Sequence, residues 1–337
     1  MKNDLPDVAL DTPFVFILGC GRSGTTMLRS MFDSHPDIAI PGESGFIWQR
    51  RNRYENRGGV DVRRFVSELT AHPRFKRWGL DRGLVQRELA NPPTDGFADL
   101  IRRLYRVYAD SRGKERFGDK TPAHVLRISQ IAQLFPEARI IHLIRDGRNV
   151  AMSYVDIKEW GPSSVTEAAL YWRRRVEHGR RDGGRLGENR YQEVTYEALV
   201  DDPESELRRL CAFVDLGFDE SMLRYFERAS EVLSLELHPH RHQGLYSPPT
   251  KGLRDWRTKM SDEDVARFEA VAGETLEEFG YGRRFDHIST ASRIGASLEI
   301  GAVGLRRAEA LARGASRKLD WRRRTATRRV KSSAEGK

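Results

Sequence analysis

The residues best suited to chemistry lie in a glycine-rich loop near the start of the chain. Residues 19–26, GCGRSGTT, fit the phosphate-loop pattern G-x-x-x-x-G-K-S/T except that Thr25 occupies the lysine position. Backbone N–H groups of such a loop bind an anion, together with the positive end of the following helix. The hydroxyls of Ser23, Thr25 and Thr26 add donors, and Arg22 adds positive charge. The loop therefore predicts an anion-binding site.

The absence of the loop lysine bears on whether the loop could belong to an ATP or GTP enzyme. In an ATP or GTP enzyme this lysine reaches the β- and γ-phosphates, and the hydroxyl after it holds Mg²⁺. A loop with Thr25 in that place argues against a standard ATPase. An ordinary tight turn before a helix remains the alternative for the same residues.

Three more candidate residues follow segments expected to be strands or turns. Lys120 follows an expected strand over 115–119, and Arg145 follows the apolar run 138–144. Ligands of open α/β sheets bind beyond the carboxyl ends of strands, and an arginine fork suits a phosphate dianion. Glu43, after Pro41 and Gly42, could accept a proton. The alternatives are a surface ion pair for Arg145, a snorkelling Lys120 and a solvated Glu43.

The elements that would position these residues alternate along the chain. The run PFVFILG at 13–19 is typical of a buried parallel strand, and apolar spacing predicts a helix over 25–33. We expect further strands at 115–119, 138–144 and 190–195, and helices within 60–113 and near 123–134, 164–182, 203–214, 219–232 and 262–279. This order predicts an α/β fold with a doubly wound, mostly parallel sheet of the phosphate-loop type, flanked by helices.

Charge is concentrated at the end of the chain. The net charge is +9, and residues 288–337 alone hold 13 Lys and Arg against 4 Asp and Glu. We expect an extension at 1–12, one domain at 13–287 and a basic tail at 288–337, either an amphipathic helix for an anionic membrane surface or disordered. The rest of the chain is near neutral, so a nucleic-acid partner is not expected. Without a long apolar run or secretory signal, a cytoplasmic location is predicted, with peripheral membrane association through the tail.

Three stretches of the sequence resemble the sulfotransferases that use 3′-phosphoadenosine-5′-phosphosulfate (PAPS). The loop is similar to the family's 5′-phosphosulfate loop, and GRSGTTMLRSMFDSHPDIAIPGES at 21–44 is similar to its tyrosylprotein branch. IIHLIRDGRNVAMSY at 140–154 resembles the family's 3′-phosphate site, and Lys120-Thr121-Pro122 lies between the two. The resemblance implies transfer of a sulfuryl group from PAPS to an acceptor hydroxyl, with PAP as the product.

The resemblance also implies a role for each candidate residue. The residues implied to bind the 5′-phosphosulfate are Arg22, Ser23, Gly24, Thr25 and Thr26, and those implied for the 3′-phosphate are Arg145 and Ser153. Glu43 takes the place of the general base, and Lys120 with Arg22 steadies the transferring group. Tyr196 takes the place of a donor contact, and Lys251 and Arg254 could close over the donor. No metal is expected, because these cations neutralise the donor.

Several alternatives stay open from the sequence. Ile157 stands where the tyrosylprotein branch has a basic residue, so carbohydrate, glycolipid, small hydroxyl compound and tyrosyl peptide all remain candidate acceptors. The competing functions are a phosphate-loop kinase, or a non-enzymatic anion-binding protein whose tail binds membrane or nucleic acid. His238, His240 and His242 would share one face of an extended strand, as a metal site could use, but a solvated loop is the favoured interpretation.

Overall fold

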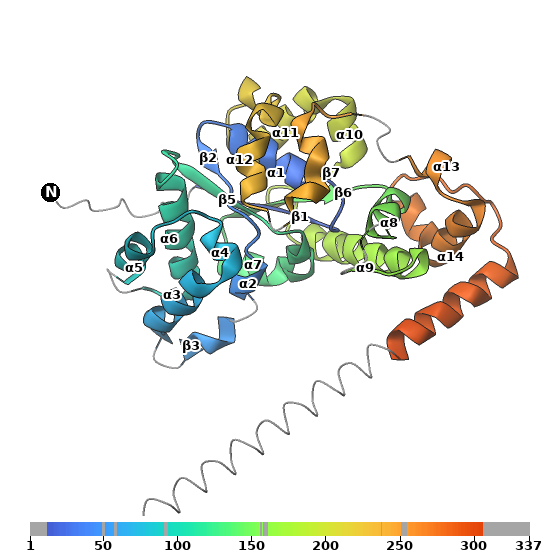
Figure 1. Ribbon diagram of the computed structural model, residues 1–337, viewed down its shortest axis with the longest axis horizontal. Helices are drawn as coiled ribbons and strands as arrows, with labels where there is room; N and C mark the ends of the chain where they lie inside the picture. The colour runs from blue at the N-terminus through green and yellow to red at the C-terminus, as the bar shows by residue number, and fades with distance from the viewer. Residues whose placement is uncertain are drawn as a thin grey trace, which may run out of the picture. The chain divides into compact units, whose positions relative to one another are not determined.

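A parallel five-stranded sheet lies between helices in the computed structural model (Figure 1). The structure describes residues 12–48, 51–56, 59–90, 94–155, 157, 161–236, 238–250 and 255–305. The strands are β1 (Phe14–Gly19), β2 (Ile38–Ala39), β5 (Arg116–Lys120), β6 (Ala138–Ile144) and β7 (Tyr191–Thr195). Their order is β2-β5-β1-β6-β7, and every pairing is parallel. The predicted doubly wound, mostly parallel sheet is confirmed.

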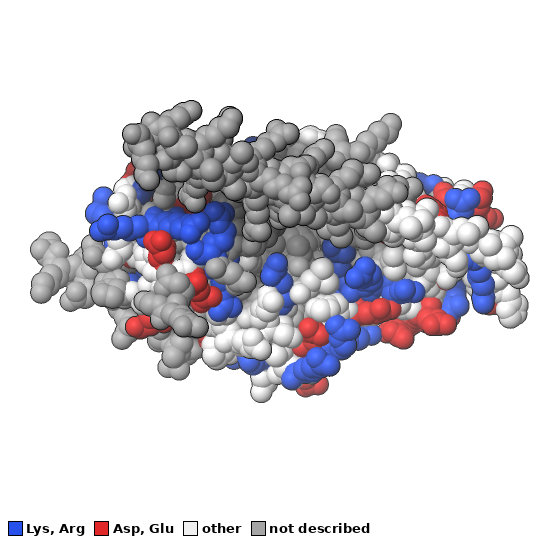
Figure 2. Space-filling model, turned by 90° about the horizontal axis from the view of Figure 1, so that it is seen from below, with Lys and Arg blue, Asp and Glu red and all other residues white. Residues whose placement is uncertain are grey.

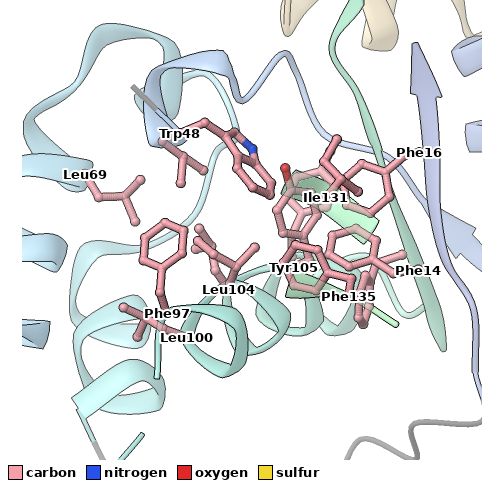
Figure 3. Packing of buried hydrophobic residues seen from close by; sticks show 14 of the residues in the cluster. Phe14, Phe16, Trp48, Leu69, Phe97, Leu100, Leu104, Tyr105, Ile131 and Phe135 are labelled. Atoms are coloured by element: carbon pink, nitrogen blue, oxygen red, sulfur yellow. The ribbon is translucent and has the colours of Figure 1, made fainter. Parts of the chain in front are cut away.

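Both faces of β1 are buried, which explains its continuous apolar sequence. Phe14, Phe16 and Leu18 point to one face, where Figure 3 shows Phe14 and Phe16 among residues that include Tyr105 and Phe135. Val15 and Ile17 point to the other face and join a second apolar cluster. The alternating side chains of a strand therefore supply two cores, one on each side of the sheet.

Different helices cover the two faces (Figure 1). Residues of the first cluster come from α2 (Gly45–Trp48), α3 (Val62–Ala71), α4 (Pro73–Lys76), α5 (Arg82–Ala90), α6 (Phe97–Asp110) and α7 (Ile128–Leu134). Those of the second come from α1 (Thr25–Ser34), α10 (Tyr196–Asp201), α11 (Pro203–Phe213) and α12 (Ala229–Ser234). The result is a sheet packed between two helical layers.

The register of the strands brings the ends of β1, β5 and β6 together. Ile17 pairs with Lys120 of β5, and Gly19 pairs with Leu143 of β6. The loop after β1, the last residue of β5 and the residue after β6 therefore meet at one edge of the sheet. This is the edge at which open α/β sheets bind their ligands.

The predicted helices differ from the observed ones in two places. The segment expected at 123–134 begins as a 3₁₀ helix, η2 (Pro122–Arg127), before α7. The segment expected at 219–232 is broken into η3 (Glu220–Met222), η4 (Tyr225–Arg228) and α12. In η3 the Asp219 side chain accepts a hydrogen bond from the N–H of Ser221. Met222 and Tyr225, three residues apart, are both buried. A three-residue repeat suits 3₁₀ turns better than an α-helix.

The remaining elements are short or lie towards the end of the chain. They are η1 (Arg51–Arg53), β3 (Glu55–Asn56), β4 (Gly59–Val60), α8 (Gly147–Val155), α9 (Val165–Gly184), η5 (Pro239–Tyr246), α13 (Trp256–Lys259) and α14 (Asp262–Glu278). Two compact units are distinguishable, residues 1–153 with 172–258, and residues 154–171 with 259–337. The parallel sheet belongs to the first unit. The domain boundary at 287 and 288 stays a prediction.

Only the beginning of the basic tail lies within the described residues. Residues 290–305 are helical, and Ile294, Leu298 and Leu305 of the expected apolar stripe are 56%, 70% and 69% exposed. None of the described helices is long and apolar enough to cross a membrane. On the face shown in Figure 2, basic and acidic side chains of the described residues are interspersed. The most basic part of the tail, 306–337, lies outside the described residues.

Candidate functional site

The loop between β1 and α1 has the backbone geometry of a tight anion cradle. Arg22 has a φ of 70° and Gly24 a φ of 98°, both in the left-handed region that few residues other than glycine adopt. The N–H of Ser23 donates to Cys20, and the first turn of α1 closes on the carbonyl of Gly24. Gly24 is the N-cap of α1 and has no side chain with which to cap it. The positive end of α1 therefore faces this loop.

A buried hydroxyl in the loop lacks a partner. The Ser23 side chain is completely buried, and its Oγ makes no hydrogen bond to the described residues. A buried polar atom without a partner costs about 1–3 kcal/mol. An oxyanion bound in the loop would supply the missing acceptor, which fits the prediction that Ser23 contacts an anionic ligand.

A cavity of about 450 Å³ opens beside the loop. It is lined by Arg22, Gly24, Thr25, Thr26, Met27, Arg145, Tyr196, Tyr225, His240, His242, Gly244, Leu245, Pro249 and Thr250. The guanidinium of Arg145 lies 4.1 Å from the centre of the Tyr196 ring, within cation–π range. The cavity thus joins the loop, Arg145 and Tyr196, three parts of the chain that the sequence analysis assigned to one ligand.

Ser153, predicted for the 3′-phosphate site, contacts Arg22 of the loop. Ser153 is buried on α8, and its Oγ accepts a hydrogen bond of 2.9 Å from Nε of Arg22. Asp146, between β6 and α8, accepts from the N–H of Arg148 in the manner of an N-cap, and pairs with its guanidinium at 2.8 Å. The Trp256 indole also donates to Asp146 at 3.0 Å. Asp146 thus links the start of α8 to Trp256, and Ser153, near the end of α8, contacts the loop.

One ammonium group links the loop to two carboxylates. Nζ of Lys120, which is fully buried, lies 3.3 Å from Oγ1 of Thr26, 3.2 Å from Oε1 of Glu43 and 3.1 Å from Oε1 of Glu236. The Glu43 side chain is 32% exposed, and its other oxygen pairs with Arg74 at 3.5 Å. Glu43 and Lys120, predicted separately, are thus in direct contact, and Lys120 also reaches the loop.

The sequence analysis did not identify Glu236. Its carboxylate is buried and also accepts a bond of 2.9 Å from Arg29 of α1. Burial opposes ionisation, but the charges of Lys120 and Arg29 lower the pKa of Glu236 to about 2. Nothing in the spacing of residues around Glu236 marked it, because it lies in a segment whose composition is that of a loop.

Hydrogen bonds between neighbouring residues hold Glu43 and Lys120 in place. The backbone N–H of Ser44 donates to Oγ1 of Thr121 at 2.9 Å, and the Ser44 hydroxyl donates to Asp119. Asp119 is buried and also bonds Tyr105 at 2.6 Å and His124 at 3.0 Å. Although burial opposes ionisation, His124 and these hydrogen bonds lower the pKa of the Asp119 carboxyl. Asp119 and Thr121, on either side of Lys120, therefore hold Ser44, the residue after Glu43.

Of the other residues named from the sequence, some lie outside the described residues and some line the cavity. Lys251 and Arg254 lie outside the described residues. His240 and His242 line the cavity, but they lie on η5, and no extended strand aligns them with His238. Burial and the nearby charges of Lys120, Arg22 and Arg29, partly offset by Glu236, lower the pKa of His242 to about 4. Among the described residues, no group of three His, Cys, Asp or Glu side chains could hold a metal ion.

We expect Gly24→Ala to destabilise the protein more than Gly59→Ala. Both glycines have positive φ, so either substitution carries a backbone cost on the order of 1 kcal/mol. A Cβ on Gly24 would lie 2.5 Å from the Tyr196 ring, whereas a Cβ on Gly59 would have no atom within 4 Å among the described residues. Overpacking adds about 1–3 kcal/mol at Gly24, measurable as the difference in unfolding free energy in urea. Equal losses would mean that Tyr196 does not pack against the loop.

Comparisons with known proteins agree with this geometry. The protein-tyrosine sulfotransferase A of Caenorhabditis elegans is 25% identical over 80% of this chain and 67% of its own length. The nodulation protein NoeE of Sinorhizobium fredii is 27% identical over 82% of this chain and 68% of its own length. The protein-tyrosine sulfotransferase of Drosophila melanogaster is 25% identical, and the chain spans 41% of its length.

The fold has a solved counterpart as well. The sulfotransferase domain from the Synechococcus PCC 7002 olefin synthase superimposes with a TM-score of 0.59 at 24% identity, covering 83% of this chain and 99% of that domain. A profile described as the sulfotransferase family matches residues 13–220, which include the loop, Glu43, Lys120 and Arg145. The chain therefore belongs to the sulfotransferase family of transferase enzymes.

Proposed function

We propose that the protein transfers a sulfuryl group from PAPS to an acceptor hydroxyl by metal-independent, in-line displacement, with Glu43 as the general base. The observation that carries this proposal is the position of Lys120. Its ammonium hydrogen-bonds both Thr26 of the anion loop and the carboxylate of Glu43. The donor group bound by the loop and the carboxylate that takes the acceptor proton would therefore both lie beside the Lys120 ammonium.

The donor would be held by the loop and by the residues beyond β6. Backbone N–H groups of the loop and the hydroxyl of Ser23 suit the 5′-phosphosulfate, since they lie at the positive end of α1. Arg145 lines the same cavity and suits the 3′-phosphate. Ser153 reaches this site through its bond to Arg22. The stacked Tyr196 ring offers an apolar face to the nucleotide.

The chemical step follows from the arrangement of Lys120 and Glu43. The acceptor oxygen attacks sulfur, the bond from sulfur to the bridging oxygen of PAPS breaks, and PAP leaves with that electron pair. Glu43 accepts the proton from the acceptor hydroxyl, and its 32% exposed side chain is open to a substrate entering from solvent. Lys120 stabilises the negative charge that develops on the bridging oxygen.

The acceptor we propose is a hydroxyl-bearing compound, with tyrosyl peptides as the first class to test. Several similar proteins are named protein-tyrosine sulfotransferases. Carbohydrates, glycolipids and small hydroxyl compounds form the other classes. Each class is incubated with radiolabelled PAPS, and the sulfated product is identified by mass spectrometry. If no class accepts label and no sulfate is released, the proposed activity is wrong.

We expect Glu43→Gln to lower turnover while leaving PAP affinity nearly unchanged, and we expect the effect of Lys120→Ala to fall mainly on turnover. Loss of a general base typically costs about 10² to 10⁴-fold in turnover. Glu231→Gln is the matched control, since Glu231 is an exposed carboxylate paired with Arg228 on the same unit. Turnover is measured with radiolabelled PAPS and PAP affinity by calorimetry. Near-normal turnover in Glu43→Gln would eliminate Glu43 as the base.

We expect Arg145→Ala to weaken PAP binding directly, because it removes a charge-assisted partner of a phosphate. Arg208→Ala is a close control. Its guanidinium also lies 4.1 Å from an aromatic ring, that of Phe218, but Arg208 is on α11 and does not line the cavity. A charge-assisted hydrogen bond is worth about 1.5–3 kcal/mol, or roughly 10- to 150-fold in PAP affinity. Equal affinities for the two variants would remove Arg145 from the donor site.

We expect transfer to continue in the presence of EDTA. The cations that would neutralise the donor are side chains, namely Arg22, Lys120 and Arg145, so no divalent ion is needed for charge balance. Activity is compared before and after chelation, and after addition of Mg²⁺ or Zn²⁺. Loss of transfer with EDTA and recovery with either metal would contradict the metal-free mechanism and favour kinase-like chemistry.

We further propose that the basic tail holds a cytoplasmic enzyme at an anionic membrane surface. Each basic residue near such a surface contributes about 1 kcal/mol or less, and these contributions sum over the tail. The full chain is expected to float with anionic but not neutral liposomes, and high salt should release it. A chain ending at His287 should not bind, yet should still sulfate a soluble acceptor. Unchanged binding after truncation would instead indicate a solvated tail without this role.

A further inference from the structure

The buried carboxylate of Glu236 contacts Lys120 but has no role in the proposed function. Its Oε1 lies 3.1 Å from Nζ of Lys120 and 2.9 Å from a guanidinium nitrogen of Arg29. Neither cation reaches solvent: the side chains of Lys120 and Arg29 are both fully buried. Two buried cations with a single buried anion between them form a cluster that is costly to disturb.

The main chain at Glu236 is also anchored against the stretch that carries Glu43. Arg77 donates to the carbonyl of Glu236 at 3.0 Å. A Cβ on Gly42 would lie 2.9 Å from the carbonyl of Leu235, so only glycine allows the two backbones to approach this closely. Arg29, while paired with Glu236, donates from Nε to the carbonyl of Ile40 at 2.9 Å. The stretch 40–43 and Glu236 are therefore parts of one rigid arrangement.

Lys120 is consequently shared between two carboxylates with different surroundings. Glu43 is partly exposed and must turn to an acceptor hydroxyl if it is the base. Glu236 is buried, is held by Arg29 and Arg77, and does not line the donor cavity. Among the described residues, Glu236 is therefore the carboxylate that can keep Lys120 beside Thr26 while Glu43 engages the acceptor.

We infer that Glu236 is a positioning residue for the transfer reaction: it fixes the ammonium of Lys120 beside the anion loop independently of Glu43. Glu236 touches neither donor nor acceptor in this arrangement and acts through Lys120. This inference rests on the proposed sulfuryl transfer, and it adds a residue to the reaction that the motif stretches do not contain.

The test is a double-mutant cycle between Glu236 and Lys120, measured as turnover of radiolabelled PAPS and as PAP affinity. We expect Glu236→Gln to lower kcat about tenfold or more, with PAP affinity changed by less than about threefold. In a Lys120→Ala background, Glu236→Gln should lower kcat by less than about twofold, because the group through which it acts is gone. Glu231→Gln, an exposed substitution of the same type, should have no effect in either background.

The folding of the variants is controlled within the same design. Glu236→Gln leaves Arg29 buried without its anion and Lys120 with Glu43 alone, and could unfold the chain, which thermal unfolding detects. The Lys120→Ala and Glu236→Gln double variant removes one cation with the anion. If the single variant does not fold, Glu236→Gln is instead compared in an Arg29→Met background, which also balances the charge.

The outcomes separate this inference from the proposed function. An equal fall in kcat with and without Lys120 would show that Glu236 does not act through Lys120 and would overturn the inference alone. A fall in PAP affinity that matches the fall in kcat would also overturn it, because Glu236 would then be a donor-binding residue. Failure of the unchanged protein to turn over PAPS with any acceptor class would overturn the proposed function, and this inference with it.

Discussion

The arrangement of the site depends on one physical constraint, the burial of the Lys120 ammonium. Removing such an ion from water costs several kcal/mol unless it is paired and hydrogen-bonded. An ammonium has three donors, and Thr26, Glu43 and Glu236 supply three acceptors. Thr26 lies at the start of α1, Glu43 follows β2, and Glu236 lies shortly after α12, while Lys120 itself ends β5. Neutralising one charge thus ties four segments of the chain together at the end of the sheet.

The parts of the site that could be predicted from the sequence are those fixed by local pattern. The loop at 19–26 is contiguous, and Arg145 follows directly on an apolar strand, so each could be placed by itself. Their meeting also follows, since the carboxyl ends of parallel strands share one edge of a sheet. The contact between Glu43 and Lys120 could not be reached this way. Glu43 follows a two-residue strand, and although its carboxylate could accept a proton, its place opposite the donor came from the family resemblance.

Other features depend on tertiary contacts that leave no periodic trace. Glu236 and Lys120 are 116 positions apart, and a single glutamate in a segment rich in proline and histidine carries no pattern. Asp119 lies within a strand and is hydrogen-bonded by residues from α6, η2 and the stretch before α2. The breaks at 122–127 and 220–228 arise because a proline and local caps favour 3₁₀ turns where apolar spacing alone suggested continuous helix.

The same constraint explains why a loop without the usual lysine can still serve an anionic donor. Thr25 occupies the lysine position, but Lys120 delivers an ammonium to the neighbouring Thr26 from the end of β5. A cation that comes from β5 and contacts Glu43 would, under the proposed function, also connect the donor to the base. Under the proposed function, an anion entering the loop would compete with Glu43 for Lys120, while Glu236, held by Arg29, would keep its contact with Lys120. Under the proposed function, donor binding would therefore weaken the hold of Lys120 on Glu43, leaving that carboxylate available to the acceptor proton.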